Sequence, residues 1–138
     1  MQRETANITL RARHRSLDEV AGLADAELYR RYVRPLDYDF GVERDAWYAV
    51  VGMVFRTGTP WIYGVPAACS ASSIEALPLA LFDAEFRLLI PRGWVVTTNS
   101  RGAVELLPER LANIPEWYAR ALDADSEILS ILDEILSL

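Results

Sequence analysis

The sequence predicts an α+β fold built as a single domain from residues 1–138. Three observations predict it: apolar residues at helical spacing near the N-terminus, consecutive strand-like runs separated by tight turns, and an amphipathic run at the C-terminus. Strands joined by short turns pair antiparallel, whereas a parallel sheet needs a helix between successive strands. We therefore expect an N-terminal helix, then an antiparallel meander of about four or five strands, then C-terminal helices.

The first predicted element is a helix that begins at Ser16. Ser16 and Glu19 have the S-x-x-E spacing of a capping box, in which each side chain bonds to a backbone N–H of the first turn. Apolar residues then recur at helical spacing through residues 17–32, and Pro35 ends the pattern. A break near Gly22 gives two short helices as the alternative.

Five segments have the composition of strands. The apolar runs 47–55 and 61–65 flank a Thr-Gly-Thr-Pro turn, which predicts a hairpin. Residues 86–90 and 94–98 flank Pro-Arg-Gly, and residues 103–107 follow an Asn-Ser-Arg-Gly turn. These segments make up the expected meander.

The C-terminal region predicts helices. Pro108 and Pro115 suit the first position of two short helices, and Asp125 is placed to cap a third over residues 126–138. The apolar stripe of the last helix is wider than one surface helix needs, so it either completes the core or pairs with a second copy. The residues predicted for that homodimer interface are Ile128, Leu132, Ile135 and Leu136.

Charge is distributed unevenly along the chain. Residues 1–63 contain nine arginines and nine acidic residues, whereas residues 64–138 contain five arginines and eleven acidic residues and so carry the net charge of −6. Residues 1–15 hold four arginines and one glutamate, and we expect a flexible basic arm there. An acidic surface repels nucleic acid, and no apolar run suits a membrane span or a secretory signal. We therefore expect a cytoplasmic protein whose partner is another, more basic protein.

Few side chains can support chemistry near neutral pH. All fourteen basic residues are arginine, and the chain has one histidine, His14, and one cysteine, Cys69. Nucleophiles and bases usually rely on Cys, His or Lys, and zinc sites need several Cys or His ligands. A free cysteine is usually a buried core residue. We therefore expect no catalytic residue, metal or cofactor, with Cys69 in the core.

An acidic and aromatic segment precedes the predicted hairpin. It fails as a calcium loop, because the sixth and twelfth positions counted from Asp37 are Val42 and Tyr48 instead of Gly and Glu. Acidic and aromatic side chains together suit docking on a basic partner. The predicted partner-binding residues are Asp37, Tyr38, Asp39, Glu43, Asp45, Trp47 and Tyr48.

Three functions agree with these observations. The first is a non-catalytic acidic binding protein of a bacterial cytoplasm, an immunity- or antitoxin-type inhibitor or a dedicated chaperone that masks its partner. The alternative is a small carboxylate-based enzyme or ligand-binding domain that uses acids such as Asp37, Asp39, Glu85 or Glu105 in a cup of the sheet. The third is a homo-oligomeric structural component.

Overall fold

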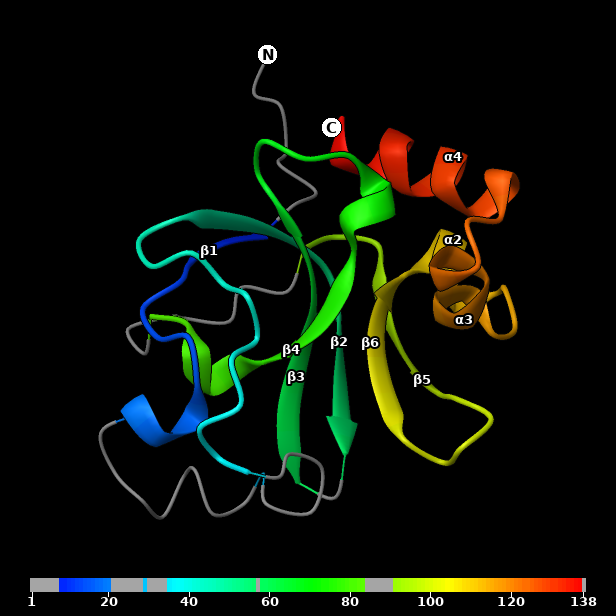
Figure 1. Ribbon diagram of the computed structural model, residues 1–138. Coiled ribbons are helices and arrows are strands. Elements are labelled where there is room, and N and C mark those ends of the chain that lie inside the picture. Colours follow the sequence, from blue (N-terminus) through cyan, green and yellow to red (C-terminus); the bar gives the residue numbers. More distant parts are fainter. Residues whose placement is uncertain (1–7, 21–28, 30–34, 57, 84–90, 138) are drawn as a thin grey trace.

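Six strands form one antiparallel sheet, and the helices follow it at the C-terminus (Figure 1). The computed structural model describes residues 8–20, 29, 35–56, 58–83 and 91–137. Among these residues, no helix has both the length and the apolar character that a membrane crossing requires. The strands are β1 (Ile8–Arg11), β2 (Trp47–Arg56), β3 (Thr59–Pro66), β4 (Glu75–Pro78), β5 (Trp94–Thr98) and β6 (Val104–Pro108).

Strand β2 is the centre of the sheet. The strand order is β4-β3-β2-β6-β5, and β1 also pairs with β2. Residues 47–50 of β2 pair with β1, and residues 53–55 pair with β6, so these two strands share one edge of β2. The register between β2 and β3 shifts between Val50 and Gly52. At the same place, the partner on the opposite edge of β2 changes from β1 to β6. The hairpin expected from residues 47–55 and 61–65 is present as β2 and β3, but β6 returns to β2 and the sheet is not a simple meander.

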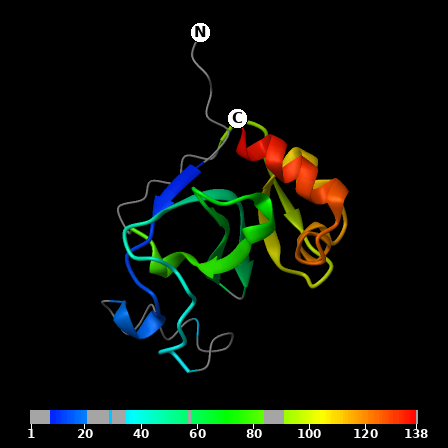
Figure 2. The same ribbon diagram turned by 45° about the horizontal axis from the view of Figure 1, so that its top comes forward.

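The sheet curls so that the chain after β4 meets β1 (Figure 2). Ala12 forms a bridge with Phe82. The amide N of Arg13 donates to the Leu81 carbonyl at 2.9 Å, and the amide N of Asp83 donates to the Arg11 carbonyl at 3.0 Å. Strands β1 to β4 therefore wrap around an apolar core. The largest fully buried core side chains include Leu17, Met53, Ile62, Leu77, Leu107 and Leu132.

The C-terminal helices are α2 (Glu109–Ala112), α3 (Trp117–Leu122) and α4 (Ser126–Leu136). The predicted cap of the last helix is confirmed, because the Asp125 carboxylate accepts from the amides of Glu127 and Ile128 at 3.0 and 3.4 Å. A carboxylate at this position also stabilises the positive end of the helix dipole. Figure 1 shows α3 beside β6 and β5, and α4 across one end of the sheet.

The predicted N-terminal helix is wrong in the described part of the chain. Only a 3-10 turn, η1 (Leu17–Glu19), forms there, and Val20 is already extended at φ −72° and ψ 127°. The Ser16 hydroxyl donates to the Asp18 carboxylate, and Glu19 Oε1 accepts from the Arg15 amide at 3.2 Å. The two capping-box side chains are therefore engaged elsewhere, and strands dominate the fold.

Three further expectations need revision or lie outside the described residues. The expected flexible arm is wrong for residues 8–11, which form β1, while residues 1–7 lie outside the described residues. The strand expected at 86–90 also lies outside them, as does most of the helical pattern in 21–34. Strand β4 lies in a stretch where the sequence favours no element.

Candidate functional site

A pocket of about 400 Å³ opens between the sheet and the segment that leads into α3. Strands β2, β3, β5 and β6 contribute to its walls, together with residues 112–119. The sheet and α3 therefore hold the pocket between them, on the side where Figure 1 shows β5, β6 and α3 together. We call it the Glu105 pocket, and its principal side chains are Arg56, Tyr63, Thr97, Glu105, Trp117 and Tyr118.

Glu105 is a buried carboxyl group in the wall of this pocket. It pairs in register with Val54 of β2 and Thr97 of β5, and only 5% of it is exposed. The Tyr63 hydroxyl donates to Glu105 Oε2 at 2.5 Å. Burial raises the pKa of Glu105, and the Tyr63 hydroxyl, the Trp117 indole and the positive charge of Arg56 oppose that rise without cancelling it.

Gly52 allows Tyr63 to reach Glu105 across the central strand. Gly52 of β2 lies opposite Tyr63 of β3 in the sheet. A Cβ atom on Gly52 would lie 2.5 Å from Leu107 Cδ2 and 3.2 Å from Tyr63 Cδ2. Glycine is required here because the two side chains close over the space that a methyl group would occupy. The bare backbone thus lets a hydroxyl from β3 bond to a carboxyl on β6.

Three aromatic rings form the apolar part of the pocket. The ring of Tyr63 lies 4.7 Å from Trp117 and 4.8 Å from Tyr118, measured between centroids. The Tyr118 hydroxyl accepts from the Ala76 amide at 2.8 Å, which fixes α3 against β4. The indole Nε1 of Trp117 is buried and acts as a hydrogen-bond donor on the Glu105 carboxyl group.

Both signs of charge line the mouth of the pocket. The guanidinium of Arg56 lies over the ring of Trp61, 5.0 Å from its centroid. Arg101 and Glu116 also line the pocket, and Glu116 has a left-handed backbone with φ 56°. Its carboxylate accepts from the Ser100 hydroxyl. Two arginines and Glu116 therefore line the pocket together with the buried Glu105.

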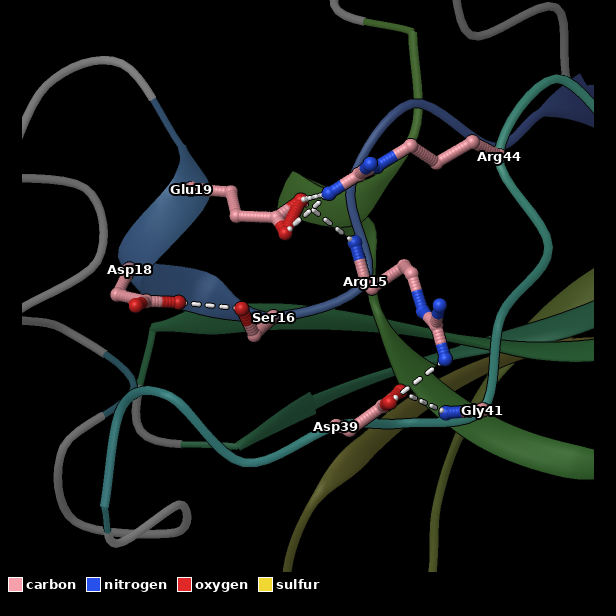
Figure 3. Close-up of polar contacts among 7 residues, drawn as sticks. All are labelled: Arg15, Ser16, Asp18, Glu19, Asp39, Gly41 and Arg44. Atoms are coloured by element: carbon pink, nitrogen blue, oxygen red, sulfur yellow. Dashed lines mark hydrogen bonds and ion pairs between the residues drawn. The ribbon is translucent and has the colours of Figure 1, made fainter.

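The predicted partner-binding segment lies elsewhere, in the loop that leads to β2. Figure 3 shows Asp39 between Arg15 and Gly41, and Glu19 beside Arg44. Asp39 Oδ2 accepts from Arg15 at 2.7 Å, and Arg44 donates to both oxygens of Glu19 at 2.7 Å. The Gly41 amide and then Arg15 lower the pKa of Asp39, while Arg44 and then the Arg15 amide lower the pKa of Glu19.

Asp45 continues the same set of ion pairs. Its Oδ1 lies 3.0 Å from Arg11 Nη2 and 3.2 Å from Arg13 Nη1. The basic residues of the predicted arm therefore neutralise Asp39 and Asp45 of the predicted binding segment, which reduces their attraction for a basic partner. We call this set the arginine–carboxylate network; its members are Arg11, Arg13, Arg15, Glu19, Asp39, Arg44 and Asp45.

The other residues of the predicted segment differ in exposure. Tyr38 and Trp47 are 54% and 53% exposed, whereas only 6% of Tyr48 is exposed. Asp37 and Glu43 are exposed. Binding of a partner by this segment stays a prediction; in this structure its two exposed aromatic rings are the side chains best placed for it.

The predicted homodimer interface lies on α4. Ile128, Leu132 and Ile135 are buried in the core of the same chain, and Leu136 is partly buried. Pairing with a second copy stays a prediction, but it would have to use the outer side of α4, since the apolar stripe already packs inward.

The described residues do not group His, Cys, Asp or Glu side chains in threes that could hold a metal ion. Cys69 is exposed, so the expectation of a core cysteine is wrong. His14 is partly buried, and its amide donates to the Leu81 carbonyl at 3.1 Å.

Of the acids named for the alternative function, Glu105 lines the pocket. Asp39 belongs to the arginine–carboxylate network, and Glu85 lies outside the described residues. Sequence reasoning missed Trp117 and Gly52. The sequence does carry a signal for the buried carboxyl group of Glu105, because it is a lone acid within the apolar strand 103–107. Comparisons with protein family models, curated proteins and solved structures found no match for this chain.

Proposed function

We propose that this chain is a binding protein that receives a side chain of a protein partner in the Glu105 pocket. The observation that carries the proposal is an open pocket whose wall holds a buried carboxyl group among three aromatic rings. Apolar pockets with a few convergent polar groups are the usual form of a binding site. The role that fits best is an immunity- or antitoxin-type inhibitor, or a dedicated chaperone, that masks its partner.

Charge and residue type support a protein as the partner. Tyrosine, tryptophan and arginine are the residues that most often anchor protein interfaces, and all three types line this pocket. Residues 64–138, which supply most of the pocket, carry the net charge of −6. Long-range attraction of a basic partner would raise the rate of association, while the pocket would hold the partner once docked.

The test is affinity purification of the tagged chain from its native host at low salt. Ala119 is exposed on α3 and lines the pocket, so Ala119→Arg places a bulky side chain at its mouth. Ser130 is exposed on α4 outside the pocket, so Ser130→Arg adds the same charge as a matched control. We expect the wild type and Ser130→Arg to recover a stoichiometric partner and Ala119→Arg to lose it.

Two outcomes would contradict the proposal. Repeated recovery of no stoichiometric partner by the wild-type chain would argue against a binding function. Recovery that survives Ala119→Arg but is lost in Trp47→Ala would place the binding surface at the exposed aromatic side chains Tyr38 and Trp47 instead.

A small carboxylate-based enzyme is the second candidate, and the raised pKa of Glu105 in an open pocket is the observation that favours it. A carboxyl group with a raised pKa keeps its proton to a higher pH than an ordinary glutamate and can donate it to a substrate. A screen with chromogenic ester, phosphate and glycoside substrates tests this. A saturable reaction that is lost in Glu105→Gln, with the fold retained, would favour the enzyme over the binding protein.

A further inference from the structure

We propose that strand β5 pairs antiparallel with β5 of a second copy of this chain, so that the two sheets join across a two-fold axis. β5 is the last strand in the order of the sheet, and β6 is its only neighbour among the described strands (Figure 1). The inference goes beyond the proposed function, because it concerns the backbone edge of β5 and no ligand of the Glu105 pocket.

The hairpin of β5 and β6 fixes which backbone groups of β5 face outward. At its turn, the Asn99 amide donates to the Ala103 carbonyl at 2.9 Å. At its other end, the Glu109 amide donates to the Gly93 carbonyl at 2.9 Å, and the register between the two ends has no shift. Hydrogen-bonded and non-hydrogen-bonded pairs alternate along an antiparallel ladder. The odd-numbered residues of β5 therefore direct their N–H and C=O groups toward β6, and the even-numbered residues direct theirs away from it.

Val96 and Thr98 thus present N–H and C=O groups at the free edge, where no described residue bonds to them. In a two-fold pairing centred on Val96, each Val96 exchanges both backbone hydrogen bonds with its copy. The Thr98 amide then donates to the Trp94 carbonyl of the second copy. The outward groups of β5 are therefore satisfied by the same groups of an identical strand.

The side chains of β5 suit contact with an identical strand. Residues 94–98 contain no charged residue and no proline, and Val96 is 72% exposed. A two-fold axis places each Val96 opposite its copy. β-branched side chains pack well on a pleated surface, whereas like charges in the same place would repel each other. Self-association through this strand therefore brings apolar groups together and no like charges.

The other described edges of the sheet are protected against such pairing. β4 contains a glutamate and Pro78, and its Ala76 amide already donates to the Tyr118 hydroxyl at 2.8 Å. The outer side of β1 is covered, since the Asp83 amide donates to the Arg11 carbonyl at 3.0 Å. Charge, proline and a covering segment are usual means by which proteins prevent pairing at an edge. Within the described part of the chain, residues 95–98 of β5 have none of them.

Charge favours a second copy over a basic partner at this edge. Residues 64–138 carry the net charge of −6, but residues 91–110, which include the β5–β6 hairpin, contain three arginines and two glutamates. This surface therefore has no excess of acid that would attract a basic partner or repel a second copy. The α4 helix is less suited to self-association, because Ile128, Leu132 and Ile135 already pack inward.

The test is the mass of the full chain in solution over a range of concentrations. A contact between two single strands is small, so we expect sedimentation to show twice the chain mass of 15.5 kDa only as concentration rises from about 10 μM to about 1 mM. Val96→Arg places like charges opposite each other and should weaken association about tenfold. Ser130→Arg adds the same charge at an exposed position of α4 and should leave association unchanged.

Amide hydrogen exchange of the wild-type chain locates the contact. Exchange of the Val96 and Thr98 amides should slow as the dimer forms, because these amides gain hydrogen bonds. Exchange of the Thr97 amide, which faces β6, should change much less.

The inference is overturned by a monomeric mass at every concentration, by a dimer that persists in Val96→Arg, or by a dimer that is lost in Ser130→Arg. A dimer in which the Val96 and Thr98 amides exchange as fast as in the monomer also overturns it, because association would then use another surface. Val96 is exposed, so Val96→Arg should keep the circular dichroism spectrum of the wild type, which separates loss of association from loss of the fold.

Discussion

The arginine–carboxylate network and the Glu105 pocket shift the pKa values of their acidic residues in opposite directions. In the network, the exposed carboxylate of Asp39 and the partly buried one of Glu19 bind arginines and backbone amides, and their pKa values are lowered. In the pocket, Glu105 is buried with a tyrosine hydroxyl as its donor, and its pKa is raised. Asp39 and Asp45, two of the acids that cluster in the sequence, are thus neutralised by arginines, whereas the isolated Glu105 lies in the wall of the pocket.

The difference follows from where each acid stands in its strand or loop. A loop beside a basic segment can bring guanidinium groups to a carboxylate at little cost in desolvation, and each exposed pair then adds little stability. An acid on a strand that faces the interior loses its water and depends on the few donors that packing supplies. Substitutions that disturb the packing around Glu105 should therefore lower the free energy of unfolding more than substitutions in the arginine–carboxylate network.

The largest expected effect is that of Gly52→Ala. The new methyl group would lie 2.5 Å from Leu107 Cδ2 and would press on Tyr63, so we expect the free energy of unfolding to fall by about 1–3 kcal/mol. Gly64→Ala is the matched control, because its Cβ would make ordinary contacts, with Ile62 Cδ1 at 3.4 Å as the nearest atom. Urea denaturation of both variants measures the difference. Equal stability of the two variants would show that Tyr63 does not need the bare backbone.

The next effect is that of Tyr63→Phe, which removes the hydroxyl that donates to Glu105. Loss of a donor to a buried carboxyl group should lower the free energy of unfolding by about 1–3 kcal/mol. Tyr38→Phe removes an exposed hydroxyl beside the network and should change it by less than about 0.5 kcal/mol. Thermal denaturation of the two variants compares the two regions directly, and similar losses would contradict the contrast drawn between them.

The smallest effect is the pH dependence of stability, which should have opposite signs in the two regions. The raised pKa of Glu105 means that the unfolded chain loses this proton first, so its contribution falls as pH rises from about 4.5 to the folded pKa. The lowered pKa of Asp39 means that its contribution is present above about 3.8 and is lost as pH falls through the folded pKa.

Glu105→Gln and Asp39→Asn separate the two contributions. Glu105→Gln should remove the loss of stability on the alkaline side of pH 4.5, and Asp39→Asn should remove part of the loss in acid. Denaturant unfolding at a series of pH values measures both slopes. A Glu105→Gln profile parallel to that of the wild type above pH 4.5 would show that Glu105 is not desolvated.

Local patterns in the sequence predicted the elements whose determinants are local. The strand at 94–98 and the helix capped by Asp125 were confirmed, since turns and caps depend on neighbouring residues. Strand β1 was missed because its partner, residues 47–50, lies far along the chain. The N-terminal helix was wrong because the side chains of Ser16 and Glu19 bind other groups than the capping-box amides.

The site could be predicted only in part for the same reason. Glu105 was named as a candidate acid, but its neighbours Tyr63 and Trp117 come from β3 and α3. Only the folded sheet brings them together, and the pattern of apolar residues does not distinguish a ring that lines a pocket from one that fills the core. The exposed aromatic residues Tyr38 and Trp47 were identified, but the arginines that neutralise the acids around them were not.

The shared edge of β2 has a consequence for biosynthesis. The first strand of the described chain and the last strand lie end to end on this edge, at residues 47–50 and 53–55. A nascent polypeptide therefore cannot complete its central sheet until residues 104–106 have left the ribosome. Until then the second half of β2 has an open edge, and pairings between such distant segments make folding slow. An open strand edge is a template for pairing with another nascent strand, so this topology exposes the chain to misassembly during synthesis.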